Sequence, residues 1–323
     1  MPVPLTTRRV LVTGGAGFIG SNLVHRLDRA GWRTVVLDDF STGRLENLAG
    51  TRAEVIKGSV GDPAALARAL DGVSAAVHLA AETSVLRSMT EPIGCHDRNV
   101  TASLHLLEEA CRRNVHVVLA SSAAVYGDRE QLPVREDART TPVSPYGASK
   151  LAMEQYAGLY ATTFRTRVLT LRFFNVFGPH QYAHGACPVV PRFVQAVLRG
   201  EPVTMFGSGR QSRDFVPVSF VTRVIHRALD EGLTAPGPVN VGSGTATPIN
   251  RLAELVQQVT GRVVPVVHLP ERPGEIHDSY ADVSLLHRLL PGLARISLRR
   301  ELQVTTRWLD GQFRRSPALS CHP

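Results

Sequence analysis

The first half of the chain alternates short apolar runs with helix-like segments, and this alternation restricts the possible folds more than any other feature. The apolar runs are mostly continuous, as expected for parallel strands that are covered on both faces. They span residues 9–13, 34–37, 54–56, 75–79, 115–120 and 168–172, and the helix-like segments span residues 18–30, 63–71, 97–113 and 146–164. The pattern predicts an α/β fold built on a doubly wound parallel sheet.

After about residue 180 the composition of the sequence and the length of its helix-like segments change. Pro and Gly become frequent, and the helix-like segments become shorter, which is typical of elements joined by many loops. With 323 residues, of which 43% are hydrophobic, the chain can bury a large core. We expect one domain over residues 1–180, to which later segments return, and a smaller mixed substrate-binding domain over residues 181–315.

The charge balance does not favour a nucleic-acid partner. The chain has 36 basic and 28 acidic residues, but the basic residues occur at most in short pairs and without interleaved aromatic residues. No apolar run is long enough to span a bilayer, and no apolar leader follows Met1. We therefore expect no membrane partner and a cytoplasmic location.

Cysteine and histidine spacing predicts neither a disulfide framework nor a metal site. No Cys-x-x-Cys pair and no His-Glu-x-x-His motif occurs, and the four cysteines are scattered at positions 95, 111, 187 and 321.

A glycine-rich loop lies between the first predicted strand and the first predicted helix. In the segment Thr13-Gly-Gly-Ala-Gly-Phe-Ile-Gly20, Gly14 would permit a tight turn, Gly17 a close approach to a pyrophosphate, and Gly20 close packing of the helix. The helix N-terminus would then offer free N–H groups to the phosphates. Asp38 ends the second strand, where a carboxylate binds ribose hydroxyls and repels a 2′-phosphate. These features predict a dinucleotide site that prefers NAD to NADP.

Tyr146 and Lys150 are four residues apart on a predicted helix, and Lys150 is one of only two lysines in the chain. Positions i and i+4 share a helix face, so both side chains can point into one pocket. A neighbouring ammonium lowers the pKa of a phenol and makes it a usable general base. The pair is therefore a candidate catalytic site.

Together with these features, the later motifs resemble the extended short-chain dehydrogenase/reductases. More narrowly, the chain resembles the nucleotide-sugar epimerase/dehydratase family in the pattern typified by UDP-glucose 4-epimerase. The resemblance covers about residues 8–310 and implies a doubly wound parallel Rossmann sheet, NAD as cofactor and a nucleotide-diphosphate sugar as substrate. The further segments that carry it are His78-Leu-Ala-Ala81, Ser121-Ser-Ala-Ala-Val-Tyr-Gly127, Arg172-Phe-Phe-Asn-Val-Phe-Gly-Pro179, Arg213-Asp-Phe215, Asn240-Val-Gly-Ser-Gly244 and Arg272-Pro-Gly-Glu275.

The resemblance implies a catalytic triad of Ser122, Tyr146 and Lys150. Ser122 would hydrogen-bond the sugar hydroxyl, Tyr146 would take its proton, and Lys150 would hold the nicotinamide ribose while lowering the pKa of Tyr146. A base and a hydride acceptor must lie against the same carbinol carbon, so positioning supplies much of the acceleration.

The resemblance also implies the binding residues. The expected NAD-binding residues are Gly14, Gly17, Phe18, Ile19, Gly20, Asp38, Asp39, Ser59, Val60, Leu79, Ala80, Ala81, Thr83, Asn99, Tyr146, Lys150 and Phe173. The expected substrate-binding residues are Ser84, Ser122, Asn175, Val189, Met205, Phe206, Arg213, Phe215, Arg272 and Ser279. Met205 and Phe206 are equally compatible with the core, and the small Ser279 leaves room for an N-acetyl group.

Residues 123 and 124 bear on the choice of reaction. Family dehydratases carry an acid/base pair there, and decarboxylases typically carry Glu at the second position, whereas this chain has Ala123 and Ala124. Because alanine cannot move a proton, 4-epimerisation is favoured over dehydration or UDP-glucuronate decarboxylation. A non-catalytic NAD sensor or partner subunit is the alternative from another class.

Three departures from the family pattern stand out, and one of them is Pro217 in place of a common His. Gly58-Ser59 replaces a usual Gly-Asp next to adenine, and Phe220 replaces a usual Asp, which raises the chance of an unusual substrate or of a partner at that surface. In similar proteins the helices at 97–113 and 146–164 form a four-helix interface, so we expect a homodimer.

Overall fold

A seven-stranded parallel sheet forms the centre of the molecule. The computed structural model describes residues 8–128, 131–182, 188–271 and 276–315. The strand order is β11-β6-β5-β4-β1-β2-β3, and all neighbouring strands are parallel. The strands are β1 (Arg9–Thr13), β2 (Arg33–Asp38), β3 (Glu54–Lys57), β4 (Ala75–His78), β5 (His116–Ser122), β6 (Val168–Phe173) and β11 (Val239–Val241). The predicted doubly wound sheet is therefore confirmed.

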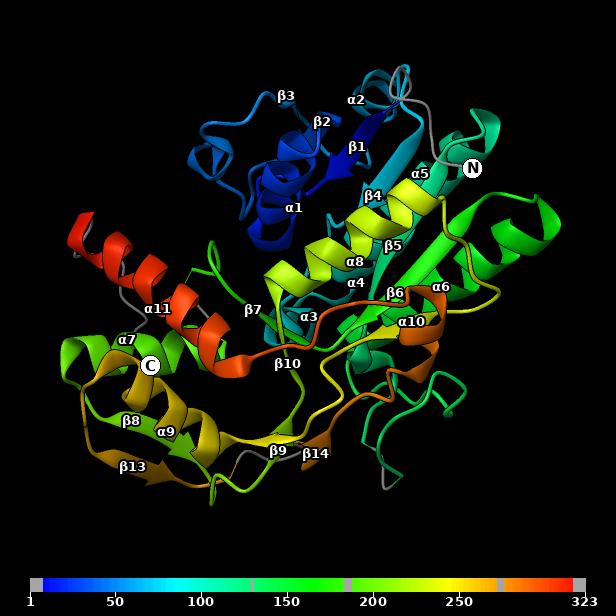
Figure 1. Cartoon of the computed structure of the whole chain (residues 1–323). Helices are drawn as coiled ribbons and strands as arrows, with labels where there is room; N and C mark the ends of the chain where they lie inside the picture. Colours follow the sequence, from blue (N-terminus) through cyan, green and yellow to red (C-terminus); the bar gives the residue numbers. More distant parts are fainter. Residues whose placement is uncertain (1–7, 129–130, 183–187, 272–275, 316–323) are drawn as a thin grey trace.

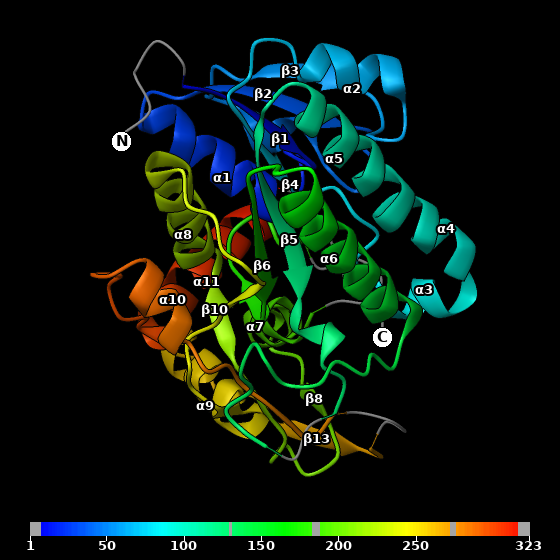
Figure 2. The same ribbon diagram turned by 90° about the vertical axis from the view of Figure 1, so that its right-hand side faces the viewer.

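Helices cover both faces of this sheet, as the continuous apolar strands require. Val10 and Val12 of β1 belong to the core on one face and Leu11 to the core on the other, because successive side chains point to opposite faces. The first face packs against α1 (Phe18–Arg29), α8 (Val218–Glu231) and α10 (Ser284–Leu289). The second packs against α2 (Pro63–Ala69), α5 (Ala102–Arg112) and α6 (Pro145–Thr163). Figure 2 shows the two layers on either side of the strands.

A second group of elements lies below the central sheet in Figure 1 and has its own apolar core. Its helices are α7 (Val189–Arg199), α9 (Ile249–Thr260) and α11 (Leu298–Arg315). Its small sheets pair β8 (Val203–Phe206) with β13 (Val266–Leu269), β7 (Asn175–Phe177) with β10 (Phe215–Pro217), and β9 (Ser212–Arg213) with β12 (Thr247–Pro248) and β14 (Asp278–Ser279). Both α8 and β11 follow residue 180 in the chain yet belong to the central layers. The division at residue 180 stays a prediction.

The segment before α5 contains more short helical elements than the sequence predicts. A continuous helix over residues 97–113 is replaced by a π-helical turn at Asp97–Thr101 followed by α5, and two short helices precede it, α3 (Val85–Thr90) and α4 (Pro92–His96). Pro92 starts α4 at a position where a missing N–H costs nothing. The π turn places Asn99 where its amide reaches the loop after β4, so this irregularity builds part of the site.

Phe220, one of the three departures from the family pattern, is a core residue. It is 4% exposed and packs with α8 against the central sheet. A carboxylate at this position would need a buried partner, whereas the phenyl ring contributes apolar contact. Because its ring faces inward, Phe220 itself offers no surface to a partner, and an unusual substrate stays a prediction.

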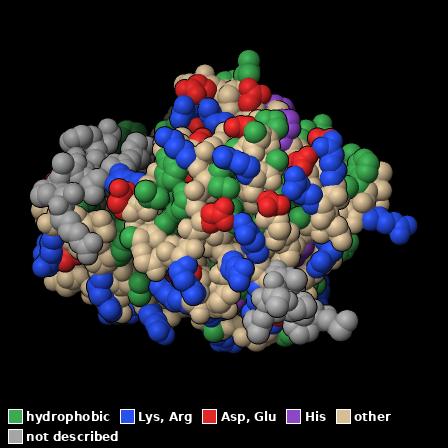
Figure 3. All heavy atoms as spheres, turned by 90° about the horizontal axis from the view of Figure 1, so that it is seen from above, with side chains coloured by type: hydrophobic (Ala, Val, Ile, Leu, Met, Phe, Trp, Pro, Cys, Tyr) green, Lys and Arg blue, Asp and Glu red, His purple; other side chains and the backbone are tan. Residues whose placement is uncertain are grey.

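Charged side chains of both signs lie on the face of the molecule that Figure 3 shows. On the face shown in Figure 3, blue and red side chains are interspersed. Among the described residues no helix is long and apolar enough to cross a membrane. Within the same ranges, no group of three or more His, Cys, Asp or Glu side chains could hold a metal ion.

Candidate active site

A large cavity of about 1510 Å³ opens at the carboxyl ends of the sheet strands, which is where open α/β sheets bind ligands. It extends from the glycine-rich loop to β7 and the start of α7. The predicted site residues that line it are Gly14, Gly17, Phe18, Ile19, Gly20, Asp38, Asp39, Ser59, Val60, Leu79, Ala80, Ala81, Thr83, Ser84, Ser122, Tyr146, Lys150, Phe173, Asn175, Val189 and Phe215.

The glycine-rich loop has the shape that a pyrophosphate cradle requires. Gly14 has a φ of 67°, and a Cβ there would lie 2.8 Å from the Ala80 nitrogen. A Cβ on Gly20 would lie 2.1 Å from the Gly14 carbonyl oxygen, so the first turn of α1 fits only without a side chain at that position. Gly17 caps α1 without a side-chain hydrogen bond. The helix N-terminus therefore presents backbone N–H groups and a positive dipole toward the cavity.

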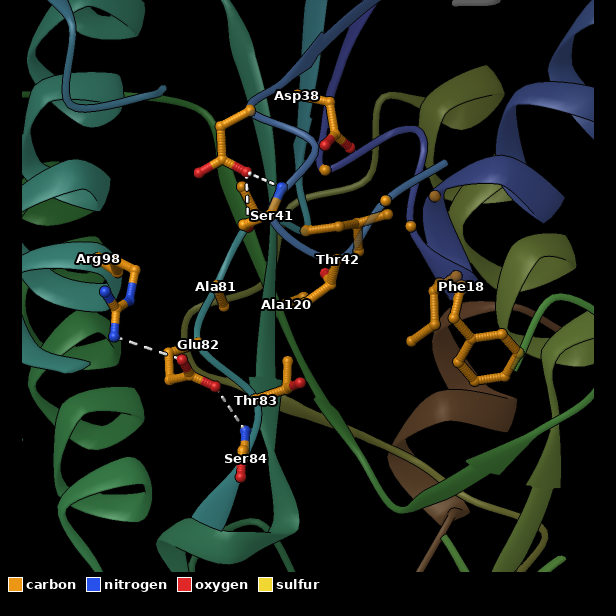
Figure 4. Close-up of a pocket in the computed structure, with 18 of the residues that line it drawn as sticks. Phe18, Asp38, Ser41, Thr42, Ala81, Glu82, Thr83, Ser84, Arg98 and Ala120 are labelled. Atoms are coloured by element: carbon orange, nitrogen blue, oxygen red, sulfur yellow. Dashed lines mark hydrogen bonds and ion pairs between the residues drawn. The ribbon is translucent and has the colours of Figure 1, made fainter. Parts of the chain in front are cut away.

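Asp38 stands at the end of β2 beside this loop (Figure 4). One carboxylate oxygen accepts a hydrogen bond from the Ala16 amide at 2.8 Å, and the other accepts one from the Phe40 amide at 2.8 Å. Burial raises the pKa of Asp38, while these two amides act in the opposite direction. The carboxylate thus fixes the loop and keeps lone pairs for a ribose, because each oxygen can accept two bonds.

Ser122, Tyr146 and Lys150 meet at the end of β5 and the start of α6. Ser122 caps the short 3₁₀ helix at Ala123–Val125, and its hydroxyl hydrogen-bonds the Tyr146 side chain. Lys150 lies one helical turn after Tyr146, is 5% exposed, and donates from Nζ to the Ala120 carbonyl oxygen at 2.9 Å. The three side chains that the sequence separates by up to 28 positions therefore share one wall of the cavity.

The pKa of Tyr146 departs from the expected direction. Burial raises it, and the hydrogen bond from Ser122 only partly opposes that effect. The ammonium of Lys150 is engaged by the Ala120 carbonyl oxygen, and burial lowers the pKa of Lys150 itself to about 8. In the protein by itself, burial therefore outweighs the lowering of the Tyr146 pKa that the neighbouring ammonium is expected to cause.

A buried ion pair supports this wall from behind. Glu154, one turn after Lys150 on α6, binds Arg172 through Nη2 at 2.7 Å and Nε at 2.9 Å. The Ser121 hydroxyl donates to the same carboxylate at 2.5 Å. Because Ser121 precedes Ser122, this bond holds the end of β5 against α6 and fixes the position of Ser122. Glu154 lies eight residues after Tyr146 on the same helix, and this spacing is the sequence signal that could have identified it.

Asn99 lies behind the cavity wall. It is 1% exposed; its oxygen accepts a hydrogen bond from the Glu82 amide at 2.7 Å, and its amide donates to the Ser149 hydroxyl at 2.9 Å. Ser149 in turn donates to the Tyr146 carbonyl oxygen at 2.8 Å. The structure thus connects Asn99 to the catalytic helix and to the loop after β4, and places other residues between it and the cavity.

The remaining predicted substrate residues lie farther along the second group of elements. Arg213 and Ser279 are direct partners in neighbouring strands β9 and β14. Met205 is 1% exposed in the third apolar core, and Phe206 packs with Arg192, whose guanidinium carbon lies 5.5 Å from the ring centroid. None of these four is among the described residues that line the cavity. Arg272 lies outside the described residues.

Sequence reasoning missed several polar side chains that line the cavity. Glu82 lies between Arg98 and the Ser84 amide (Figure 4), with Glu82–Arg98 at 3.4 Å and Ser84 N to Glu82 at 3.0 Å. Arg44 and Tyr182 also line it, although 138 positions separate them in the chain. No local motif marks these residues, because only the folded chain brings them together.

The fold, the uncapped glycine loop and the Ser122–Tyr146–Lys150 wall define a dinucleotide-dependent enzyme of the short-chain dehydrogenase/reductase type. The model of the NAD dependent epimerase/dehydratase family matches residues 10–242. The chain belongs to this family and uses NAD. The glycine cradle of this structure fits that cofactor.

Known relatives match over most of the chain. The UDP-glucose 4-epimerase of Azospirillum brasilense is 35% identical, over 83% of this chain and 82% of the relative. The UDP-N-acetylglucosamine 4-epimerase of Methanobrevibacter ruminantium M1, solved with UDP-N-acetylmuramic acid, is 34% identical with a TM-score of 0.90, over 94% and 99% of the two chains. The dTDP-glucose 4,6-dehydratase DesIV of Streptomyces venezuelae, solved with NAD, is 30% identical with a TM-score of 0.88, over 97% and 100%. Epimerases and dehydratases thus share this fold.

Proposed function

We propose that the protein is an NAD-dependent nucleotide-sugar 4-epimerase acting on a UDP-hexose or a UDP-N-acetylhexosamine. The observation that carries the proposal is the pairing of an intact Ser122, Tyr146 and Lys150 wall with two alanines directly after Ser122. The A. brasilense and M. ruminantium relatives are both named 4-epimerases. Family membership supplies the cofactor, and the residues of the wall supply the acid and base.

When bound, NAD would supply the hydride acceptor and a positively charged nicotinamide ring. Tyr146 takes the proton from the sugar 4-hydroxyl, and the Ser122 hydroxyl holds that oxygen in line with Tyr146. Lys150 remains mostly protonated at pH 7, because its pKa of about 8 lies above that pH. Loss of this proton to Tyr146 and of the C4 hydride, which NAD would accept, would leave a 4-keto sugar. The sugar would turn over in the site, Tyr146 would return the proton to the oxygen, and the hydride would return to the other face of C4.

The environment of Ala123 and Ala124 argues against dehydration. The two residues form the first turn of the 3₁₀ helix that Ser122 caps, and the Ala124 amide donates to the Ser122 hydroxyl at 3.1 Å. Their side chains are methyl groups at the positions where an eliminating enzyme needs a proton donor and a base. Epimerisation at C4 needs only Tyr146 and the hydride acceptor, so the wall suffices for it.

One assay tests the reaction. The protein is incubated in deuterated water with UDP-glucose, UDP-N-acetylglucosamine, UDP-glucuronic acid and dTDP-glucose, and products are identified by NMR. We expect a C4 epimer without solvent deuterium. A 4-keto-6-deoxy product, a decarboxylated sugar, or deuterium at C5 or C6 would contradict the proposal, and bound NAD without any turnover would favour the sensor alternative.

A tyrosine substitution tests the base. Tyr146→Phe removes the phenol oxygen and keeps the ring, so we expect C4 epimerisation to fall at least 100-fold, the scale of general-base catalysis. Retention of NAD by the variant serves as the control for an intact fold. Activity within a few fold of the unaltered protein would remove Tyr146 as the base.

We also propose that the binding residues act as the resemblance implies. Asn175 would contact the diphosphate, and its backbone pairs with β10 beside Phe215 at the cavity wall. Arg213 would clamp the diphosphate together with Arg272, because guanidinium groups match phosphate oxygens in geometry and charge. The small Ser279 next to Arg213 leaves room for an N-acetyl group, and the relative rates on the two UDP-sugars test that assignment.

A homodimer is the proposed assembly, and a cytoplasmic setting is the proposed location. Short helices α3 and α4 pack beside α6, and this face exposes large apolar side chains, namely Leu86, Met89, Ile93, Tyr156 and Leu159, with exposed fractions from 40% to 77%. Such a set is expected where two copies pair through their helices. Light scattering tests the assembly, since one chain has a mass of 35.1 kDa. Cell fractionation tests the location.

A further inference from the structure

The loop after β7 forms hydrogen bonds with α1 and with the segment between β2 and β3. The Ser21 hydroxyl of α1 contacts His180 Nδ1 at 2.7 Å, and the Asn22 amide donates to the Pro179 carbonyl oxygen at 2.9 Å. Two residues later, the Tyr182 hydroxyl donates to Asn47 Oδ1 at 2.8 Å. These bonds join segments more than 130 positions apart, so they form only when the two halves of the chain close on each other.

Tyr182 is held from both sides. The guanidinium carbon of Arg44 lies 4.1 Å from the centroid of the Tyr182 ring, which is well within the range of a cation–π contact. On another side, the Trp308 ring of α11 meets Tyr182 in an edge-on arrangement with centroids 5.2 Å apart, and it also contacts His180. In Figure 1, α11 lies on the side of the lower group of elements that faces α1.

Arg44 and Asn47, which contact Tyr182, also hydrogen-bond the glycine-rich loop. Both the Arg44 amide, at 3.1 Å, and the Asn47 side-chain amide, at 2.8 Å, donate to the carbonyl oxygen of Ala16. Ala16 lies within the loop, between Gly14 and Gly17. Arg44, Asn47, His180 and Tyr182 all line the cavity together with those glycines. A contact between Arg44 and Tyr182 therefore forms part of the wall around the half of the cavity that binds NAD.

We propose that Tyr182, gripped by Arg44 and Asn47 and backed by Trp308, is a positioning residue that slows the release of bound NAD. This role requires only that the family depends on NAD and that these side chains line the cavity beside the glycine-rich loop. An epimerase regenerates NAD in each cycle, so slow release keeps the cofactor in place between turnovers. Separating Tyr182 from Arg44 opens the wall beside the glycine-rich loop, and NAD then dissociates faster.

The experiment measures the dissociation rate of NAD from the NAD-loaded protein without any sugar. Released NAD is trapped by alcohol dehydrogenase and excess ethanol, and NADH absorbance is followed. For Tyr182→Ala we expect release about tenfold faster, the scale of a partly desolvated cation–π contact. Tyr182→Phe keeps the ring over Arg44 and should stay within about threefold of the unaltered protein. Because no sugar is present, the result is independent of the proposed epimerase activity.

Two comparisons separate this role from general stabilisation. Arg44→Ala should also speed release, and the double variant Arg44→Ala/Tyr182→Ala should release NAD no faster than the faster single variant, because both remove one shared contact. Arg199→Ala is the matched control, since Arg199 makes the same kind of contact with Phe313 of α11, at 5.4 Å. Release from Tyr182→Ala within twofold of the unaltered protein, single effects that multiply, or an equal effect of Arg199→Ala would overturn the proposal.

Discussion

Replacing Lys150 by methionine should abolish catalysis and yet stabilise the fold at neutral pH. Lys150 is 5% exposed, and burial lowers its pKa from 10.5 to about 8. Each pKa unit corresponds to about 1.4 kcal/mol, so keeping the ammonium protonated in the folded state costs roughly 3 kcal/mol at pH 7. Methionine has a similar length and removes that cost.

The gain is reduced by the hydrogen bond that methionine cannot make. Lys150 donates to the Ala120 carbonyl oxygen at 2.9 Å, and leaving a buried acceptor unpaired costs about 1–2 kcal/mol. We therefore expect the free energy of unfolding of Lys150→Met to exceed that of the unaltered protein by about 1–2 kcal/mol at pH 7. Urea unfolding after removal of bound NAD measures this difference without the linked contribution of the ligand.

The pH dependence gives the sharper check. Because the folded-state pKa of Lys150 is depressed, the unfolded state binds more protons between pH 8 and 10.5, and the unaltered protein gains stability as pH rises through that window. The advantage of Lys150→Met should shrink there and then reverse. Lys57→Met, at the other, exposed lysine, should change stability by less than about 0.5 kcal/mol at every pH. A Lys150→Met protein that is less stable at pH 7, with a difference independent of pH, would refute the reasoning.

Two further substitutions, each with a control variant, test the scaffold of the site. Gly20→Ala should abolish NAD retention, measured as NAD content, because its Cβ would lie 2.1 Å from a backbone oxygen of the glycine-rich loop. In the control Gly158→Ala, the new Cβ meets no atom within 4 Å. This control should stabilise α6 by about 0.5–1 kcal/mol, measured by thermal unfolding. Glu154→Ala should cost about 3–5 kcal/mol of unfolding free energy, because it leaves Arg172 buried and unpaired. Glu108→Ala breaks only an exposed ion pair and should cost less than about 1 kcal/mol, so equal losses in urea unfolding would contradict the assigned importance of burial.

The local parts of the site could be predicted because each depends on residues within one short segment of the chain. Glycines at fixed intervals between a strand and a helix, an acid at the end of the next strand, and a tyrosine four residues before a lysine each depend on backbone geometry within one or two elements. The structure brings Gly14, Asp38, Ser122, Tyr146 and Lys150 to one cavity for that reason. The substrate side was less predictable, since its residues come from short strands whose pairing no local periodicity reveals.

Sequence alone also predicted the doubly wound parallel sheet, because continuous apolar strands separated by helices have few ways to bury both faces. The order of the strands in that sheet came only from the structure. Only the tertiary structure decided the electrostatics. The pKa of Tyr146 rises because its ring is buried, and Lys150 is held by the Ala120 carbonyl oxygen. Likewise, the contact of Arg44 with Tyr182 exists only after two distant halves of the chain meet. Burial and long-range contact depend on the whole packed chain, so no segment of sequence encodes them separately.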